Sequence, residues 1–134
     1  MTGIWLTIKG NPVSKKNHSQ IIKTGDGKLR LIPSKSYRDY RSVFLSQVPA
    51  AFRVGLNTPH RLKAVYYMAT RRRVDLNNLL AATADLLVAA NVLEDDNAGI
   101  LYSLDGSRVM YDKDNPRVEI ELIPMVRGKE EDDA

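Results

Sequence analysis

Residues 62–97 read LKAVYYMATRRRVDLNNLLAATADLLVAANVLEDDN and contain a strand, a basic turn and a helix one after another. Leu62 to Ala69 is rich in valine and tyrosine and partly alternates, which is typical of a central strand. Leu76 to Asn91 repeats apolar residues at helical spacing, so it predicts a helix with Asn91 as its C-cap. The apolar positions of this helix are Leu76, Leu79, Leu80, Thr83, Leu87 and Ala90.

The flanking sequence predicts the remaining strands and a second helix. The strands are 4–9, 117–123 and two hairpins, 20–23 with 29–32 and 100–104 with 108–111. A helix starts after an N-cap at Ser34 or Ser36, and its core-facing residues are Tyr37, Tyr40, Phe44 and Val48. This order predicts an α+β fold, a single small domain with a mixed β-sheet and two main helices on one face.

The composition limits the class of protein. A chain of 134 residues has the length of one domain, and 43% hydrophobic residues are enough for a core at that size. The absence of cysteine excludes disulfides and thiolate zinc sites, and the two histidines argue against an imidazole-rich metal site. We find no signal-peptide pattern and no apolar run that could span a bilayer, so we expect a cytoplasmic protein that does not enter the membrane.

Charge is unevenly distributed along the chain. Residues 1–128 hold 19 basic and 12 acidic groups, a net charge of +7, and we assign them to the folded domain. Residues 129–134 form an acidic tail that we expect to be disordered. A basic domain favours a polyanionic partner such as nucleic acid, although many soluble proteins are equally basic without binding one.

Three aspartates are candidate functional residues. Asp75 lies at the start of the second helix, and Asp95 and Asp96 follow its other end. Each has an ordinary structural interpretation, because aspartate is a common N-cap and paired acids are common in turns. If strand 62–69 and the segment near 100 are neighbours in the sheet, however, Asp75 and Asp96 can converge on one Mg²⁺, which takes one or two carboxylates together with water and phosphate. Such an ion activates water and stabilises negative charge on phosphate.

Two polar helix residues and two basic clusters complete the candidate site. Asn78 and Asp85 share a helix face, and Asp85 is either a structural acceptor or a group that supports the metal ligands. Adjacent basic residues repel one another and are easiest to explain beside an anion such as a DNA phosphate. The DNA-binding candidates are Arg71, Arg72, Arg73, Lys15, Lys16 and Asn17. Contacts of this kind contribute affinity and not sequence readout.

These motifs resemble those of the RusA family of Holliday junction resolvases, which are often carried by phages and prophages. The resemblance is carried by 72–79 (RRVDLNNL), 85–87 (DLL) and 92–96 (VLEDD), and more weakly by 11–17 (NPVSKKN) and 115–120 (NPRVEI). It implies a RusA-like fold and a homodimeric, Mg²⁺-dependent endodeoxyribonuclease, with Mn²⁺ as a substitute, in a bacterial or phage-infected cell. Such an enzyme resolves four-way DNA junctions by paired nicks in DNA recombination and repair. The implied catalytic residues are Asp75, Asp96 and Asp95, and the implied metal ligands are Asp75, Asp96 and Asn77.

Two positions depart from the family pattern. Asn77 stands where the family has a second carboxylate, and Ala81 stands where it has a lysine on the helix. Asn77 still offers a carbonyl oxygen to a metal ion, but the loss of a charge weakens metal binding and water activation. Two alternatives therefore stay open beside the nuclease. One is a junction-binding protein without catalysis, and the other is a small protein-interaction domain with no preference for nucleic acid.

Overall fold

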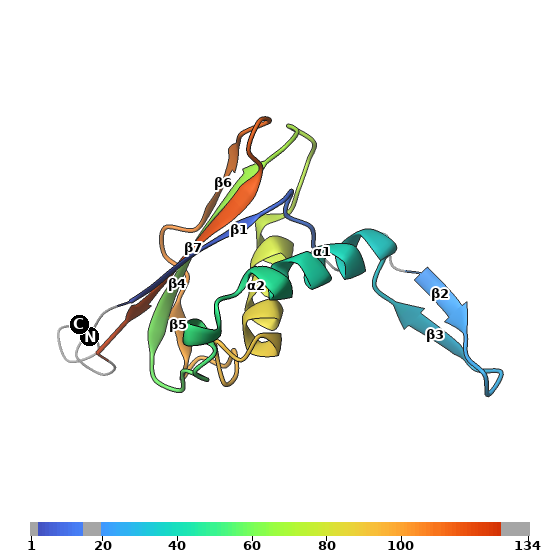
Figure 1. The fold of residues 1–134 in the computed structure, drawn as a ribbon, viewed down its shortest axis with the longest axis horizontal. Helices are drawn as coiled ribbons and strands as arrows, with labels where there is room; N and C mark the ends of the chain where they lie inside the picture. The colour runs from blue at the N-terminus through green and yellow to red at the C-terminus, as the bar shows by residue number, and fades with distance from the viewer. Residues whose placement is uncertain (1–2, 15–19, 127–134) are drawn as a thin grey trace.

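The computed structural model describes residues 3–14 and 20–126, and Figure 1 shows its elements. They are β1 (Ile4–Lys9), β2 (Gln20–Lys23), β3 (Leu29–Ile32), α1 (Lys35–Gln47), the 3-10 helix η1 (Ala50–Phe52), β4 (His60–Met68), α2 (Leu76–Ala89), β5 (Leu101–Ser103), β6 (Arg108–Tyr111) and β7 (Arg117–Pro124). This order confirms the α+β class predicted from the sequence. None of the helices within the described ranges is long and apolar enough to cross a membrane.

A mixed sheet forms the centre of the fold. β7 lies between β1 and β4 and is antiparallel to both, while β5 and β6 lie along the other edge of β4 and are parallel to it. Because β4 and β5 run in the same direction, the chain must cross over between them, and α2 forms this crossover. The β4–α2–β5 unit therefore fixes the basic turn before α2 and the acidic residues after it relative to one sheet.

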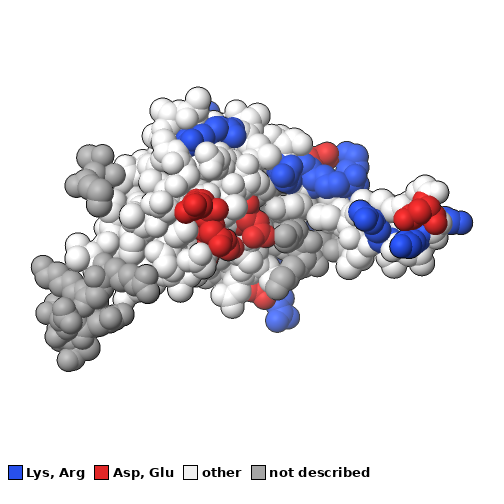
Figure 2. Space-filling view, turned by 90° about the horizontal axis from the view of Figure 1, so that it is seen from below, with Lys and Arg blue, Asp and Glu red and all other residues white. Residues whose placement is uncertain are grey.

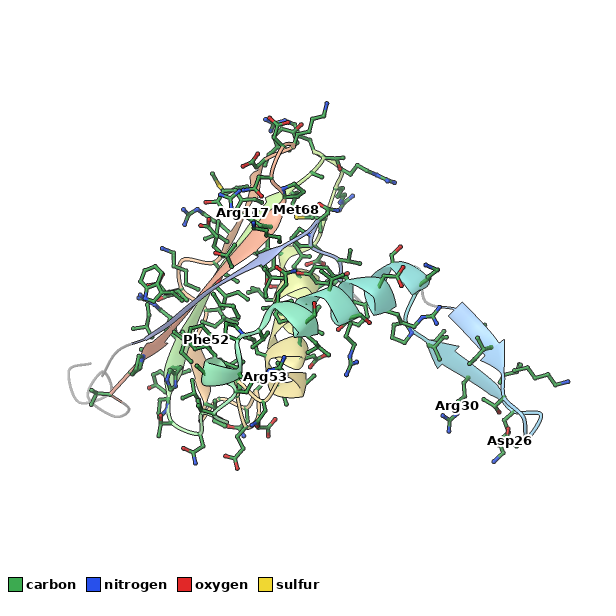
Figure 3. All side chains as sticks on the ribbon, viewed as in Figure 1. Asp26, Arg30, Phe52, Arg53, Met68 and Arg117 are labelled. Carbon is green, nitrogen blue, oxygen red and sulfur yellow. The ribbon has the colours of Figure 1, made fainter. Side chains whose placement is uncertain are left out.

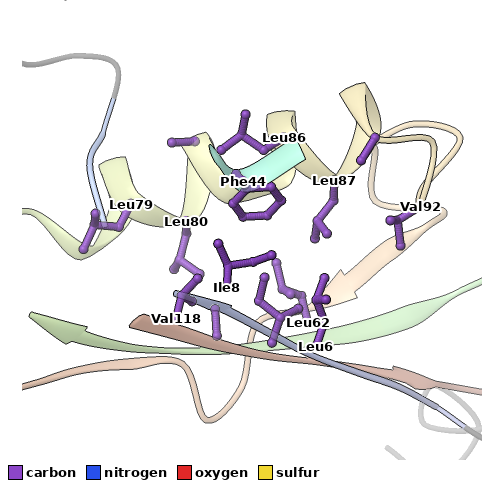
Figure 4. Packing of buried hydrophobic residues seen from close by; sticks show 14 of the residues in the cluster. Leu6, Ile8, Phe44, Leu62, Leu79, Leu80, Leu86, Leu87, Val92 and Val118 are labelled. Carbon is purple, nitrogen blue, oxygen red and sulfur yellow. The ribbon is translucent and has the colours of Figure 1, made fainter. Parts of the chain in front are cut away.

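Both helices pack on one face of the sheet, and the core lies between the two layers (Figures 1 and 4). The predicted core positions of the first helix, Tyr37, Tyr40, Phe44 and Val48, are all buried. Fully burying a side chain such as Phe44 contributes roughly 1.5–3 kcal/mol. One polar contact crosses the core, since the Tyr66 hydroxyl of β4 is hydrogen-bonded to Thr83 Oγ1 of α2 at 2.7 Å. Both partners are buried, so this bond also fixes the position of α2 on the sheet.

The predicted second hairpin, 100–104 with 108–111, is wrong. β5 and β6 do not pair with each other, because both pair with β4 in parallel as two parts of an interrupted edge strand. The turn between β5 and β6 was expected to reverse the chain, but it only separates the two parts of the edge strand. Gly106 adopts a φ of 87° in this turn. Ser107 Oγ accepts a hydrogen bond from the Ala64 N–H at 3.0 Å and donates one to the Leu62 carbonyl at 3.2 Å. Its hydroxyl thus takes the place of the missing backbone pairing.

α2 ends earlier than predicted, and an arginine fixes its end. Ala90 is the C-cap, and Asn91 lies one residue beyond it in the left-handed region with a φ of 58°. The Asn91 side chain donates to the Arg53 carbonyl at 3.2 Å. The Arg53 guanidinium, labelled in Figure 3, donates to the carbonyls of Ala90, Leu45 and Val48. Arg53 therefore joins the C-terminal ends of α1 and α2.

β2 and β3 form the first predicted hairpin, which is confirmed. With its turn it is here called the arm (residues 20–32). The arm extends from the N-terminal end of α1 and projects away from the sheet (Figure 1). None of its residues belongs to the core cluster or packs against it. The arm is therefore a separate feature attached to the side of the compact body.

Candidate functional site

Asp75 is the N-cap of α2. Its Oδ1 accepts hydrogen bonds from the backbone N–H groups of Asn77 at 2.9 Å and Asn78 at 3.4 Å. The structural interpretation of this residue is therefore correct. Both bonds use the same carboxylate oxygen and the side chain is exposed, so Oδ2 is accessible to another ligand. The positive end of the helix dipole also favours a carboxylate at this position.

The acidic residues after α2 lie in a loop with a buried base, here called the acidic loop (residues 94–97). Val92 and Leu93, which precede it, are fully buried. The Leu56 N–H donates to the Val92 carbonyl at 2.9 Å, and the Glu94 N–H donates to the Leu56 carbonyl at 2.9 Å. These contacts fix the start of the acidic loop on the body, while its own side chains are exposed.

The Asp95 carboxylate is held by hydrogen bonds within the acidic loop. Asp95 Oδ1 accepts from the backbone N–H of Asp96 at 2.8 Å, and its Oδ2 accepts from Asn97 Nδ2 at 3.1 Å. These donors, the Asp96 N–H foremost, hold the pKa of the Asp95 carboxyl below its usual value. Asn97 is fixed in turn, because its Oδ1 accepts from the Gly99 N–H at 2.9 Å. Asp95 therefore shapes the loop, and its catalytic role stays a prediction.

The fold brings Asp96 to the start of α2. Asp96 and Asn77 line one hollow of about 280 Å³. The other described residues that line it are apolar, namely Leu80, Ala81, Ala84, Leu101 and Leu104. Asp75 lies two residues before Asn77 and lines another hollow, of about 540 Å³, together with Arg73, Val74, Leu76 and Asn78. Asn77 therefore shares a hollow with Asp96, whereas Asp75 and Asp96 line different hollows.

The predicted metal ligands are of the residue types that bind Mg²⁺. In residues 3–14 and 20–126, no three histidine, cysteine, aspartate or glutamate side chains gather as a metal-binding group. Asp75, Asp95 and Asp96 therefore form no such group, and the predicted ligand set of Asp75, Asn77 and Asp96 has two carboxylates and one amide. Two carboxylates and a carbonyl oxygen are hard ligands, and Mg²⁺ commonly takes its other ligands from water and phosphate. The donor chemistry therefore fits Mg²⁺.

The two predicted supporting residues have different surroundings. Asn78 is half-buried and supports Asp75 directly, because its backbone N–H donates to the Asp75 carboxylate. Asp85 is half-buried between the buried Ala84 and Leu86, as its position in the apolar helix predicts. Asp85 also has an interaction partner, which agrees with the rule that a partly buried carboxylate needs one.

The three arginines before α2 form an exposed basic surface. Arg71 Cζ lies 4.2 Å from the centroid of the Tyr111 ring at the end of β6. Arg71 and Arg72 border a hollow of about 470 Å³ whose lining includes Met68 and Tyr111. No ion pair between described residues includes Arg71, Arg72 or Arg73. Their positive charge is therefore accessible to an anion, and an aromatic ring holds one of the three guanidinium groups.

The second predicted basic cluster, Lys15, Lys16 and Asn17, lies outside the described residues. The loop that leads to it is described, and its start is fixed. Asn11 Oδ1 accepts a hydrogen bond from the Ala69 N–H at 2.9 Å, just after the end of β4. The N-terminal loop and the arginine segment therefore begin side by side.

Sequence reasoning missed two residues that shape the site. Tyr111 is 40 positions away from Arg71, and its contact depends on the pairing of β6 with β4, for which no local signal exists. Asn97 was within reach of sequence reasoning, because an aspartate followed two residues later by asparagine is a local turn signal.

The chain was also compared with known proteins. No protein-family model matches it, and no curated protein matches it either. The resemblance to the RusA family therefore rests on the motif residues themselves.

Proposed function

We propose that this protein is a Mg²⁺-dependent endonuclease that cuts branched DNA. The observation that supports this best is the hollow shared by Asn77 and Asp96, next to the Asp75 cap. Arg73 lines a second hollow, the one that Asp75 also lines. Hard oxygen ligands beside phosphate-binding arginines are what metal-assisted phosphodiester hydrolysis requires.

In this proposal, Asp75, Asp96 and Asn77 hold the ion. When bound, the ion supplies an activated water and stabilises negative charge on the phosphate. The other residues position the DNA and these ligands. The Asp95 carboxylate orders the loop that carries Asp96, and the Asn78 N–H fixes Asp75. The arginines at 71–73 bind the DNA backbone and hold the phosphate beside the carboxylates.

The resemblance to the RusA family extends the proposal to the substrate and the assembly. The substrate is a four-way (Holliday) junction, which is resolved by paired nicks during DNA recombination or repair. A homodimer suits this reaction, because a two-fold axis supplies one site for each of two opposing strands. The setting that goes with this activity is the cytoplasm of a bacterial or phage-infected cell.

A junction-binding protein without catalysis is the second candidate, and one observation favours it. Among the described residues, no lysine or arginine lines the hollow of Asn77 and Asp96, and Ala81 occupies the position of the family's lysine. A site with one carboxylate fewer and no nearby cation binds the metal ion less tightly and activates its bound water less well. The exposed arginines would still bind DNA in such a protein.

A cleavage assay separates these candidates. The protein is incubated with a labelled four-way junction in Mg²⁺, Mn²⁺ or EDTA, and binding and nicking are measured separately. We expect paired nicks with metal and none in EDTA. Asp96→Asn should abolish nicking and preserve binding, whereas Asp105→Asn, at an exposed carboxylate in the turn before β6, should leave both unchanged.

Each contrary outcome has a clear meaning. Binding without nicks in either metal would refute the nuclease and support the binding protein. In that case, nicking by Asn77→Asp combined with Ala81→Lys would show that these two positions cause the loss. Equal affinity for a junction and for an unrelated polyanion would leave only the protein-interaction domain.

A further inference from the structure

One face of the arm carries three highly exposed aliphatic side chains. Ile21 is paired with Leu31 and Lys23 with Leu29, so these four side chains share one face. Three of them are aliphatic, and Ile21, Leu29 and Leu31 are 70%, 72% and 71% exposed. The arm thus presents a small apolar face to solvent.

The body of the protein does not cover this face. In Figure 3, Asp26 and Arg30 mark the arm well beyond the end of α1. An isolated two-stranded hairpin is at best marginally stable in water, and contiguous exposed apolar side chains usually mark a binding surface. The arm therefore fits a partner that covers its apolar face.

The charge of the arm indicates the class of partner. Lys23, Lys28 and Arg30 are opposed only by Asp26. The Asp26 carboxylate is occupied within the turn, where it accepts hydrogen bonds from the Thr24 hydroxyl and from the Lys28 N–H. At the base of the arm, Arg38 and Arg41 are further exposed basic residues, whereas Lys35 is paired with Asp39 at 2.7 Å. Figure 2 shows lysine and arginine side chains on the arm and on the adjoining part of the body. This distribution complements a polyanion.

We propose that the arm inserts its apolar face at the branch point of a DNA junction. The inference rests on the proposed DNA substrate but not on nuclease chemistry. A two-stranded ribbon fits a DNA groove, and aliphatic side chains can act as wedges between base steps while lysine and arginine bind the flanking phosphates. Stacking is already interrupted at a branch point, so the wedge costs less free energy there than in a linear duplex. The arm thereby recognises structure without reading bases.

Apolar variants test the wedge. The double variant Leu29→Ser/Leu31→Ser is compared with Val54→Ser, which removes an exposed aliphatic side chain outside the arm. Affinities for a four-way junction and for a linear duplex of the same sequence are measured in EDTA. The double variant should bind the junction about tenfold more weakly and the duplex within about twofold of the wild type, because the wedge is used only at the branch point. A 2-aminopurine at the branch point should show a smaller fluorescence change with the double variant.

Charge variants provide a second, independent readout. Lys28→Gln combined with Arg30→Gln should weaken junction and duplex binding alike, because these residues contact phosphates. The slope of log affinity against log salt should fall by about 2. A charge effect confined to the junction would contradict the division of roles between cations and wedge.

Two outcomes would overturn the proposal. One is unchanged junction affinity in the double variant. The other is a change in its oligomeric state by light scattering without DNA, which would mean that a second copy covers the apolar face. If the wild type does not nick but binds junctions through the arm, the nuclease fails and the arm stands. If the wild type nicks and the double variant binds the junction normally, the nuclease stands and the arm proposal fails. Circular dichroism checks folding, which should persist because the arm lies outside the core.

Discussion

Substitutions of Asp75 can separate its role in stability from its proposed role in catalysis. The carboxylate accepts one bond of 2.9 Å and one long bond of 3.4 Å at an exposed helix start. Asp75→Ala loses both bonds and should destabilise the fold by about 1 kcal/mol, the usual value of an N-cap. For a domain of this size, that lowers Tm by about 4 °C. Asp75→Ser and Asp75→Asn keep an acceptor and should lose only a few tenths of a kcal/mol, chiefly through the helix dipole.

Thermal unfolding by circular dichroism and junction nicking are measured on the same preparations. All three variants should lose nicking, because none has a carboxylate for the metal, whereas only Asp75→Ala should lose the full capping energy. Asp105→Asn controls for the loss of a surface charge. Full nicking by Asp75→Ser or Asp75→Asn would remove Asp75 from the metal ligands, and equal destabilisation by serine and alanine would contradict the capping geometry.

Three further predictions concern the residues that hold the site in place. In a double-mutant cycle of Tyr66→Phe and Thr83→Val, chemical denaturation should give a coupling energy of about 1 kcal/mol, and additivity would show that the buried hydrogen bond contributes nothing. Arg53→Ala should lower the free energy of unfolding by about 1 kcal/mol, because the C-terminal carbonyls of both helices lose a donor, and Arg53→Gln should recover part of the loss. The lowered pKa of Asp95 contributes stability that is present above the unfolded pKa and lost as the pH falls, so the Tm of Asp95→Asn should depend less on pH than the wild type below about pH 4.

The parts of the fold that sequence predicted depend on local patterns. α2 and β4 have long apolar repeats, and the start of α1 follows from a Ser34 side chain that accepts a hydrogen bond from the Tyr37 N–H at 3.2 Å. The interrupted edge strand could not be predicted in this way. Its glycine signals a turn, but only the pairing with β4 and the Ser107 hydroxyl determine that the chain continues in the same direction.

The candidate site likewise combines features that local sequence patterns predict with features that depend on non-local contacts. The types of residue and their spacing predicted the carboxylates and the arginines, because their chemistry is visible in the sequence. The shared hollow of Asn77 and Asp96 depends on how the acidic loop returns along α2, which is set by the buried Leu93 and its pairing with Leu56. The contact of Arg71 with Tyr111 depends on strand register. Such non-local geometry has no signature in one sequence.

The arrangement of charge gives a further reason to interpret this region as functional. The acidic loop and the arginines at 71–73 each hold neighbouring like charges, which repel one another and cost stability. Opposite charges of this kind can neutralise each other, yet no ion pair within the described ranges joins the two groups. The ion pairs of the described residues lie elsewhere, at Lys35 and Arg117. Locally unfavourable arrangements are typical of functional sites. A cation bound at the carboxylates and a polyanion bound at the arginines would relieve both repulsions at once, which is the combination that a metal-dependent nuclease places at its site.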